Sequence, residues 1–195
     1  MSVRVVLATH NAHKVTELRS ILGPALDGIE LVAYDGPEPV EDGATFEENA
    51  LIKARAASAY TGLPALADDS GICVDALGGE PGIHSARYAG TRDDADNVAL
   101  LLTNLDAEPN RAAQFVCAAA LVVGDREFVQ RGVWPGSVLH EPTGLNGFGY
   151  DPVFRPAGLS GSSAELSSDE KNAISHRQRA FTALIATTRD VLLDS

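Results

Sequence analysis

Hydrophobic and polar residues along the chain group into segments with two different periods, one typical of strands and one typical of helices. Residues 3–8 (VRVVLA) form a short apolar, β-rich run. Residues 11–22 follow with apolar positions at helical spacing, and Gly23 and Pro24 end that pattern. The same criteria predict further strands over 29–34 and 63–68, with residues 71–77 continuing the second of these or starting another. They also predict helices over 45–62, 91–105 and from about 167 onward.

The longest apolar stretch contains its own turn. Residues 112–136 have the pattern of two long strands joined at Gly124 and Asp125, which predicts an antiparallel hairpin. Later in the chain, the stretch GFGYDPVF has the composition of a glycine-rich loop that enters a short strand. Strands and helices that alternate, with a hairpin among them, predict an α/β fold with a mixed central β-sheet flanked by helices.

The composition is that of an ordinary globular chain with a sizeable core: 195 residues, 45% hydrophobic and 22% charged. This length favours a single domain over 1–195, with room for two lobes. No apolar run reaches the roughly 18 residues of a membrane span, and the first residues lack the features of a signal peptide. Cys73 and Cys117 both lie in apolar, strand-like runs, so we expect reduced thiols in a cytoplasmic protein.

The net charge of -12 argues against a broad binding surface for nucleic acid or for an anionic membrane. An anion would then need a local positive pocket or a metal ion. The 15 basic residues include three lysines, Lys14, Lys53 and Lys171, and each falls in a segment with other features of a site. A lysine supplies a compact, flexible point charge, which suits such a role.

The junction between the first strand and the first helix, residues 8–14 (ATHNAHK), has the features of an anion site. A helix N-terminus offers free backbone N–H groups and the positive end of the helix dipole. Thr9 and Asn11 can donate hydrogen bonds or cap the helix, and Lys14, one turn in, can reach the same anion. The spacing is not that of a Walker A loop, and an ordinary capped helix with a solvated lysine is the alternative.

The helix over 45–62 follows Glu41 and begins with capping-box spacing between Thr45 and Glu48. Asn49 and Lys53 are four residues apart, so they share one face of this helix. Taken alone, the segment is also typical of an ordinary amphipathic helix.

Two adjacent carboxylates, Asp68 and Asp69, follow an apolar run where a buried strand should avoid charge. Successive side chains of a strand point to opposite faces, so both can serve one cleft only where the strand ends. Ser70 and Gly71 are turn formers, and we expect them to end the strand there. Ligands bind at such strand ends in α/β sheets, and a carboxylate in that place can hold Mg²⁺ or activate water. The alternative is an Asx-type turn cap.

Two later segments complete the candidate chemistry. In residues 146–152 (NGFGYDP) the glycines let backbone approach a ligand, while Phe148 and Tyr150 can stack on a planar base or plug the space under the loop. Residues 167–179 concentrate basic side chains in an acidic chain, with a solvated helix face as the alternative. These basic residues are Lys171, His176, Arg177 and Arg179.

In their order along the chain, these segments resemble the inosine triphosphate pyrophosphatase family, the dITP/XTP pyrophosphatases that remove deaminated purine nucleotides. The matching stretches are THNAHK, EDGATFEENALIKA, LADDSGICVDALGGEPGIHSARYAG, GFGYDPVF and EKNAISHRQRA, which together run from residue 9 to residue 180. The family's phosphate loop often reads T-G-N-x-x-K. This chain has His10 in the place of that glycine, while Thr9, Asn11 and Lys14 match.

The resemblance implies a Mg²⁺-dependent hydrolase of nucleotide metabolism that acts on acid anhydrides, with its active site in a cleft between two lobes. ITP, dITP and XTP would be cut between the α- and β-phosphates, giving the nucleoside monophosphate and pyrophosphate. The resemblance also implies a homodimer, while the cysteines and the net charge give the expectation of a cytoplasmic protein with neither nucleic-acid nor membrane partners.

A role for each matching residue also follows from the resemblance. Glu41 and Asp69 would be metal ligands, and Asp69 would also accept the proton of the attacking water. Ser70 would contact the substrate. The remaining residues fall into three groups: Thr9, His10, Asn11, Ala12, His13, Lys14 and Lys53 for the triphosphate; Phe148, Gly149, Tyr150 and Asp151 for the base and sugar; and Lys171, His176 and Arg177 for the edge of the base.

Two other interpretations stay open, a related pyrophosphatase acting on modified pyrimidine nucleotides and a nucleotide sensor without turnover. The segment EKNAISHR favours purines, and the presence of Lys14, Lys53 and Asp69 favours catalysis.

The three residues at the base edge also carry a geometric expectation. On one straight helix, Lys171 and Arg177 would point in directions about 120° apart. We therefore expect the helix to be interrupted between Lys171 and Ser175, with Ser175 near the N-cap of the final helix.

Overall fold

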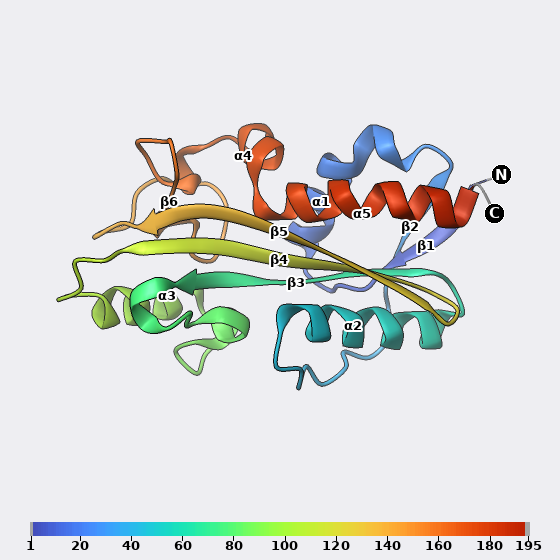
Figure 1. The fold of residues 1–195 in the computed structure, drawn as a ribbon, viewed down its shortest axis with the longest axis horizontal. Coiled ribbons are helices and arrows are strands. Elements are labelled where there is room, and N and C mark those ends of the chain that lie inside the picture. The colour runs from blue at the N-terminus through green and yellow to red at the C-terminus, as the bar shows by residue number, and fades with distance from the viewer. Residues whose placement is uncertain (1, 194–195) are drawn as a thin grey trace. The chain divides into compact units, whose positions relative to one another are not determined.

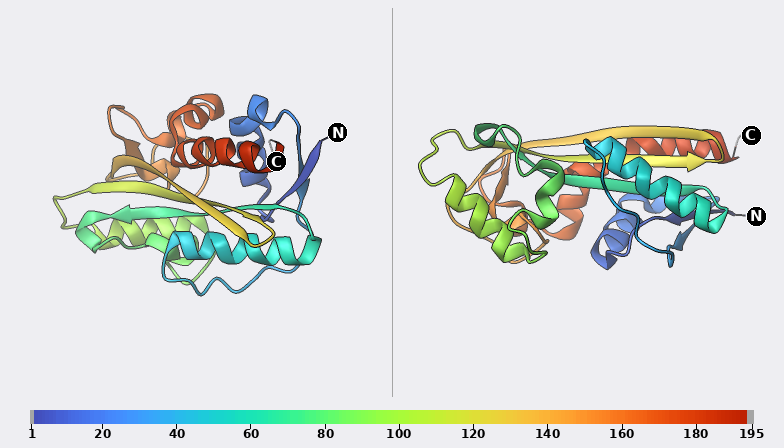
Figure 2. Two further views of the ribbon diagram at one scale, coloured as in Figure 1. Left: turned by 45° about the vertical axis from the view of Figure 1, so that its right-hand side comes forward. Right: turned by 90° about the horizontal axis from the view of Figure 1, so that it is seen from below.

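The computed structural model describes residues 2–193; within them, the side chains of Ala12, His13 and Pro24 are outside the description. The chain forms two compact units, and Figures 1 and 2 show their elements. Unit 1 comprises the described residues of Met1–Asp69, Cys117–Gly132 and Arg177–Ser195, and unit 2 comprises Ser70–Val116 and Val133–His176.

Residues 2–193 contain a six-stranded sheet with the strand order β2-β1-β3-β4-β5-β6. The strands are β1 (Val3–Leu7), β2 (Ile29–Ala33), β3 (Ala65–Val74), β4 (Ala112–Val123), β5 (Arg126–Val138) and β6 (Phe154–Pro156). β1 pairs in parallel with β2 and β3, whereas β5 and β6 are antiparallel, so the predicted mixed sheet is confirmed. The helices are α1 (Ala12–Leu22), α2 (Phe46–Thr61), α3 (Asp94–Asn104), α4 (Ser168–Ile174) and α5 (His176–Leu193).

The predicted hairpin is present as β4 and β5, which are neighbours in the sheet and are joined by Gly124 and Asp125. Gly124 has a φ of 57°, while no described residue other than glycine has a positive φ. Positive φ at the first turn position alone is the pattern of a type II′ turn, whose twist matches that of the flanking strands.

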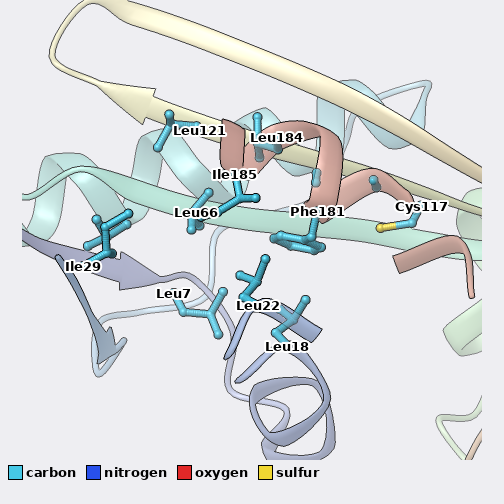
Figure 3. Packing of buried hydrophobic residues seen from close by; sticks show 13 residues of the cluster. Leu7, Leu18, Leu22, Ile29, Leu66, Cys117, Leu121, Phe181, Leu184 and Ile185 are labelled. Carbon is cyan, nitrogen blue, oxygen red and sulfur yellow. The ribbon is translucent and has the colours of Figure 1, made fainter. Parts of the chain in front are cut away.

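Unit 1 is built on the parallel strands β2, β1 and the first half of β3. Leu18 and Leu22 of α1 and Phe181 and Leu184 of α5 pack with Leu66 of β3 in one apolar cluster (Figure 3). Each of these side chains is almost fully buried, and burial of one such group stabilises the fold by roughly 2 kcal/mol. The helical period predicted for residues 11–22 therefore has a physical cause, because it turns leucines toward the sheet.

The ends of α2 follow the predicted caps. The Thr45 hydroxyl accepts a hydrogen bond from the Glu48 N–H, and Gly62 ends the helix in the left-handed conformation. The Glu48 carboxylate accepts from the Ala44 N–H instead of the Thr45 N–H, so the box closes one residue earlier than expected.

Unit 2 has its own core, formed by α3, β6 and the adjoining halves of β3, β4 and β5. Its cluster includes Leu101 of α3, Phe115 of β4, Trp134 of β5 and Phe154 of β6. Aromatic side chains make up a larger share of this buried cluster than of the cluster in unit 1.

In the described part of the chain, no helix is both long enough and apolar enough to cross a lipid bilayer. Both cysteines have free thiols, as expected; Cys117 is buried and Cys73 is half-buried.

Candidate active site

Strand β3 does not end at Asp68 and Asp69, contrary to the prediction; it continues through Ser70 and Gly71 to Val74. Gly71 has a packing role here, since a Cβ at this position would collide with the carbonyl oxygen of Gly82 and the hydroxyl of Ser85. The sequence rule for strands still holds. Because the strand continues, the two buried carboxylates point to opposite faces of the sheet, and each needs its own partners.

Asp68 is paired with cations from α1 and α5. Lys14 Nζ lies 3.0 Å from Asp68 Oδ2, and Arg177 Nε lies 3.3 Å from the same oxygen. Arg177 also forms an ion pair with Glu17 of α1 at 2.9 Å. All four groups belong to unit 1, and Lys14 and Glu17 lie one turn apart on the same helix.

Asp69 is paired with α2 instead. Lys53 Nζ lies 2.9 Å from Asp69 Oδ1, and Asn49 Nδ2 donates to Asp69 Oδ2 at 3.4 Å. The predicted common face of Asn49 and Lys53 is thereby confirmed. Figures 1 and 2 show α2 and α5 on opposite sides of β3, as the alternation of Asp68 and Asp69 requires.

The two carboxylates differ in acidity. Burial alone would raise the pKa of Asp68, but the charges of Lys14, Arg177 and Lys53 outweigh it and hold that pKa well below its usual value. Burial raises the pKa of Asp69, and there Lys53 and Lys14 only partly offset it. Environments that push two carboxyl pKa values apart distinguish a permanent anion from a proton acceptor. Asp69 is therefore the more basic of the pair.

Lys53 lies between two carboxylates, because Glu41 Oε2 is 3.3 Å from the same ammonium nitrogen that contacts Asp69. Burial would lower the pKa of Lys53, but Asp69, Asp68 and Glu41 together raise it. Glu41 reaches this place from the segment after β2, and Asn49 stabilises that segment by accepting a hydrogen bond from the Gly43 N–H at 2.9 Å.

The phosphate loop predicted after β1 is an ordered turn leading into α1. The Asn11 N–H donates to the Thr9 hydroxyl at 3.1 Å, and the Lys14 N–H donates to Asn11 Oδ1 at 3.3 Å, so Asn11 caps the helix. His10, the residue in place of the family's glycine, directs its ring toward Tyr34 at 5.4 Å and its Nδ1 toward Glu38 Oε1 at 3.2 Å. The predicted contacts of Ala12 and His13 concern side chains outside the described residues.

In unit 2, the glycine-rich loop is organised around buried Asp151. Its carboxylate accepts hydrogen bonds from the Phe148 N–H at 2.9 Å, from Lys171 Nζ at 2.6 Å and from the Ser163 hydroxyl at 2.8 Å. Lys171 Nζ also lies 4.9 Å from the centroid of the Phe148 ring, a cation–π distance. A second acidic residue contributes from α3, where Asp94 accepts from the Gly149 N–H at 2.7 Å.

Phe148 and Tyr150 of this loop have different surroundings. Tyr150 is buried in the unit 2 core and donates its hydroxyl proton to the Ser85 carbonyl at 2.8 Å. Burial raises the pKa of this phenol. Its side chain thus matches the alternative of an aromatic plug, whereas Phe148 is partly exposed. Ser70, the first residue of unit 2, is half-buried on β3.

The interruption expected before the last helix is confirmed. Ser175 has an extended backbone with φ -68° and ψ 165°, so α4 ends at Ile174 and α5 begins at His176. The break separates Lys171 on α4 from His176 and Arg177 on α5, and each of these buried basic groups has different partners. Lys171 binds Asp151 in unit 2, His176 stacks on aromatic rings in unit 2, and Arg177 pairs with Asp68 in unit 1.

A family model described as the Ham1 family matches residues 5–187 of this sequence. The chain belongs to the Ham1 family. Curated relatives of this Ham1-family chain include a dITP/XTP pyrophosphatase of Leifsonia xyli, 57% identical over 96% of both chains. A protein of the same name from Streptomyces avermitilis is 53% identical over 97% of this chain and 98% of its own. The resemblance stated from the motifs is confirmed at the level of the family.

Solved structures give the same result for the fold. A HAM1 protein from Coxiella burnetii superposes with a TM-score of 0.88 at 41% identity, covering 96% of this chain and 99% of that one. A nucleoside-triphosphatase, dITP/XTP pyrophosphatase, from Mycobacterium abscessus has a TM-score of 0.77 at 47% identity over 95% and 100% of the two chains.

Sequence reasoning missed several residues that organise the site of this Ham1-family chain. The sequence did contain an indication for Glu17, because it follows Lys14 by three residues and so shares its face of the helix. No comparable indication existed for Asp94, which also fits an exposed helix start, or for Ser163, which also fits a serine-rich loop. Their partners, Gly149 and Asp151, are brought to them by the fold.

Proposed function

We propose that the chain hydrolyses the deaminated purine nucleoside triphosphates ITP, dITP and XTP to the monophosphate and pyrophosphate. One observation carries the proposal. A carboxylate with a raised pKa, Asp69, is adjacent in sequence to a permanent anion, Asp68, and each is paired with a lysine suited to a polyphosphate. The names of the curated relatives support the same activity.

The residues present fit a magnesium ion. Mg²⁺ typically takes one or two protein carboxylates and completes its shell with water and substrate phosphates. Glu41 and Asp69 provide such a pair, since both contact one ammonium group. Within the described residues, no group of three or more His, Cys, Asp or Glu side chains could hold a metal, so a closed protein cage is not the design here. When bound, the ion would polarise the phosphate and lower the pKa of water.

In the proposed reaction, Asp69 accepts a proton from the water that attacks the α-phosphorus, and the bond to the bridging oxygen of pyrophosphate breaks. Lys53 and Asn49 fix the Asp69 carboxylate by hydrogen bonds at both oxygens. Lys14 and the loop from Thr9 to Asn11 hold the triphosphate. Fixed positive charge near the departing pyrophosphate stabilises the transition state without reorganisation.

Unit 2 is proposed to bind the nucleoside. Phe148 would stack on the base, and Lys171 and His176 would face its edge, with Gly149, Tyr150 and Asp151 shaping the loop around the sugar. Inosine and xanthosine present a 6-keto acceptor where adenine presents an amino donor. A donor aimed at that position favours the ketone and leaves adenine facing another donor.

Two pairs of consecutive residues connect the proposed halves. Asp69 and Ser70 are neighbours on β3, and His176 and Arg177 are neighbours at the start of α5. In the first pair, one peptide bond joins the proposed catalytic residue to a proposed substrate contact. We assign Arg177 to the base edge together with His176, as the resemblance implies.

We also propose that residues 1–195 act as one nucleoside triphosphate pyrophosphatase domain, in a cytoplasmic homodimer with neither a nucleic-acid nor a membrane partner. Nearly full-length coverage of the relatives supports the single domain. The acidic net charge supports the absence of nucleic-acid binding.

A substrate panel tests the proposal. Pyrophosphate release would be measured with Mg²⁺ and each of ITP, XTP, dITP, dUTP, dTTP, GTP and ATP. We expect the first three to be turned over with the highest kcat/KM. Preferred turnover of dUTP or dTTP would favour pyrimidine clearance instead, and ITP binding without any release of pyrophosphate would favour a sensor.

A further inference from the structure

We propose that Phe115 and Trp134 are positioning residues that fix the direction of the His176 ring and thereby set the selectivity for the base. The inference rests on the proposed function, because it assigns a cause to the discrimination that His176 would provide. Both residues belong to unit 2, as does His176.

The three rings are nearly parallel and mutually adjacent, and the Phe115 and Trp134 centroids are 6.5 Å apart with an interplanar angle of 26°. The His176 ring lies 4.8 Å from the Phe115 centroid with an interplanar angle of 11°, and 6.3 Å from the Trp134 centroid with an angle of 19°. All three are buried, with exposed fractions of 3% for His176, 7% for Phe115 and 3% for Trp134. The imidazole therefore lies among nearly parallel π-systems in a dry environment.

The stack is fixed by strands, while His176 itself starts a helix. Phe115 comes from β4 and Trp134 from β5, which are neighbours in the sheet. Phe154 of β6 then packs its ring against both, at 4.5 Å and 64° to Phe115 and at 5.4 Å and 59° to Trp134. Phe154 is therefore tilted against both supporting rings and does not share their plane direction.

This support determines which part of His176 can read a base. With aromatic rings along its face, the imidazole can exchange hydrogen bonds only at its edge, in the ring plane, where Nδ1 and Nε2 lie. The χ2 torsion of histidine has broad preferences, so the backbone alone would leave the ring direction loosely defined. Hydrogen bonds weaken steeply with misalignment. A ring that is fixed in direction therefore discriminates better between a keto and an amino group at the base edge.

The chain provides a matched control in Phe154. This side chain is fully buried in the same cluster and touches both supporting rings, but among the ring contacts of the described residues it makes none with His176. Loss of Phe154 should cost at least as much stability as loss of Phe115. It should affect selectivity much less.

The experiment compares Phe115→Leu and Trp134→Leu with Phe154→Leu in the full chain. Three quantities are measured: the ratio of kcat/KM for ITP to that for ATP, the inhibition constant of inorganic triphosphate, and the free energy of unfolding in urea. For Phe115→Leu and Trp134→Leu we expect the ITP/ATP ratio to fall by at least about tenfold, while triphosphate inhibition changes by less than about twofold. For Phe154→Leu the ratio should stay within about twofold of wild type despite the lower stability.

Equal loss of the ratio in Phe154→Leu, or an unchanged ratio in Phe115→Leu, would overturn the inference and leave the proposed function intact. A wild-type chain that releases no pyrophosphate from ITP would overturn the proposed function itself.

A second readout does not need a folded leucine variant. Trp134 is the single tryptophan of the sequence, so fluorescence excited at wavelengths that the four tyrosines do not absorb reports on this ring alone. IMP, at concentrations that inhibit turnover, should change the emission of wild type, whereas inorganic triphosphate should not. The change should disappear in His176→Gln. An emission response to triphosphate equal to that to IMP, or a response that persists in His176→Gln, would contradict the stack's role at the base.

Discussion

Unit 1 surrounds Asp68 and Asp69 with the charged groups of three helices, whereas unit 2 packs aromatic rings against His176 and one aromatic ring, Phe148, against Lys171. In unit 1 each buried carboxylate has its own cation, and the balance of burial against positive charge decides which carboxylate stays ionised. In unit 2, buried Asp151 binds the Lys171 ammonium and the Phe148 N–H, and aromatic rings pack against His176.

The difference matches the two parts of a nucleotide. A triphosphate is a flexible polyanion, and charge complementarity from flexible lysines suits it. A base is rigid and flat, and it presents hydrogen-bond groups at fixed angles. Aromatic packing provides the corresponding rigidity at low entropic cost. The predictions below test whether the two units divide the work in this way.

The largest effect is expected for Asp69→Asn. An amide is a poor base and a weaker metal ligand, so turnover of ITP should fall by at least about a thousandfold, or about 4 kcal/mol in the barrier, while nucleotide still binds. Stopped assays of pyrophosphate release, with nucleotide binding followed separately, measure both quantities. The exposed Asp75→Asn serves as a control near the end of the same strand. Retention of more than about a tenth of the wild-type rate would exclude Asp69 as the base.

Removal of divalent metal should have an effect of similar size. Activity should disappear in excess chelator and return with Mg²⁺. With metal present, alkaline conditions should favour activity, because the attacking water loses its proton more readily at higher pH. Full activity in the presence of chelator would remove the metal from the mechanism.

Asp68 should matter most for stability. Its pKa is lowered in the fold, so the stability that it contributes is complete above the unfolded value of about 3.9 and is lost as the pH falls toward the folded value. Asp68→Asn should lower the free energy of unfolding at pH 7 by about 3 kcal/mol, since Lys14 and Arg177 lose a buried partner.

Urea unfolding of both proteins between pH 7 and pH 3 measures this difference. The gap between wild type and Asp68→Asn should shrink below about pH 4. A gap that stays constant across the range would mean that Asp68 is not ionised in the folded state.

A small effect is expected at His10. Its ion pair with Glu38 is exposed, and such pairs contribute at most about 1 kcal/mol. His10→Gly, which restores the residue common in the family, should change KM for ITP by less than about threefold. A tenfold loss would show that the contact with Tyr34 and Glu38 positions the phosphate loop more strongly than its exposure suggests.

Local sequence signals predicted much of this molecule. The caps at Thr45 and Gly62 follow from short-range hydrogen bonding. The break at Ser175 was predicted from helix geometry together with the common ligand that the resemblance implies for Lys171 and Arg177. The common face of Asn49 and Lys53 follows from helix geometry alone.

The end of β3 was predicted wrongly for a physical reason. Two adjacent acids and a glycine are compatible with a turn, and the sequence could not show that Lys14 and Lys53 would reach them from helices on opposite faces of the strand. Long-range pairs such as Asp94 with Gly149 could not be predicted either, because only the tertiary fold brings the two residues of such a pair together.

The division between the units is tested most directly by a matched pair of lysine variants, Lys14→Met in unit 1 and Lys171→Met in unit 2. The measurement is the inhibition constant of inorganic triphosphate, taken together with KM for ITP, on variants that retain the wild-type circular dichroism spectrum. In Lys14→Met, the inhibition constant of triphosphate and KM for ITP should both rise by about ten- to a hundredfold, which corresponds to the loss of one charge-assisted hydrogen bond. Lys171→Met should raise KM for ITP while triphosphate inhibition stays within about twofold of wild type. Equal weakening of triphosphate by the two variants would contradict the assignment of the phosphates to unit 1 and the base to unit 2.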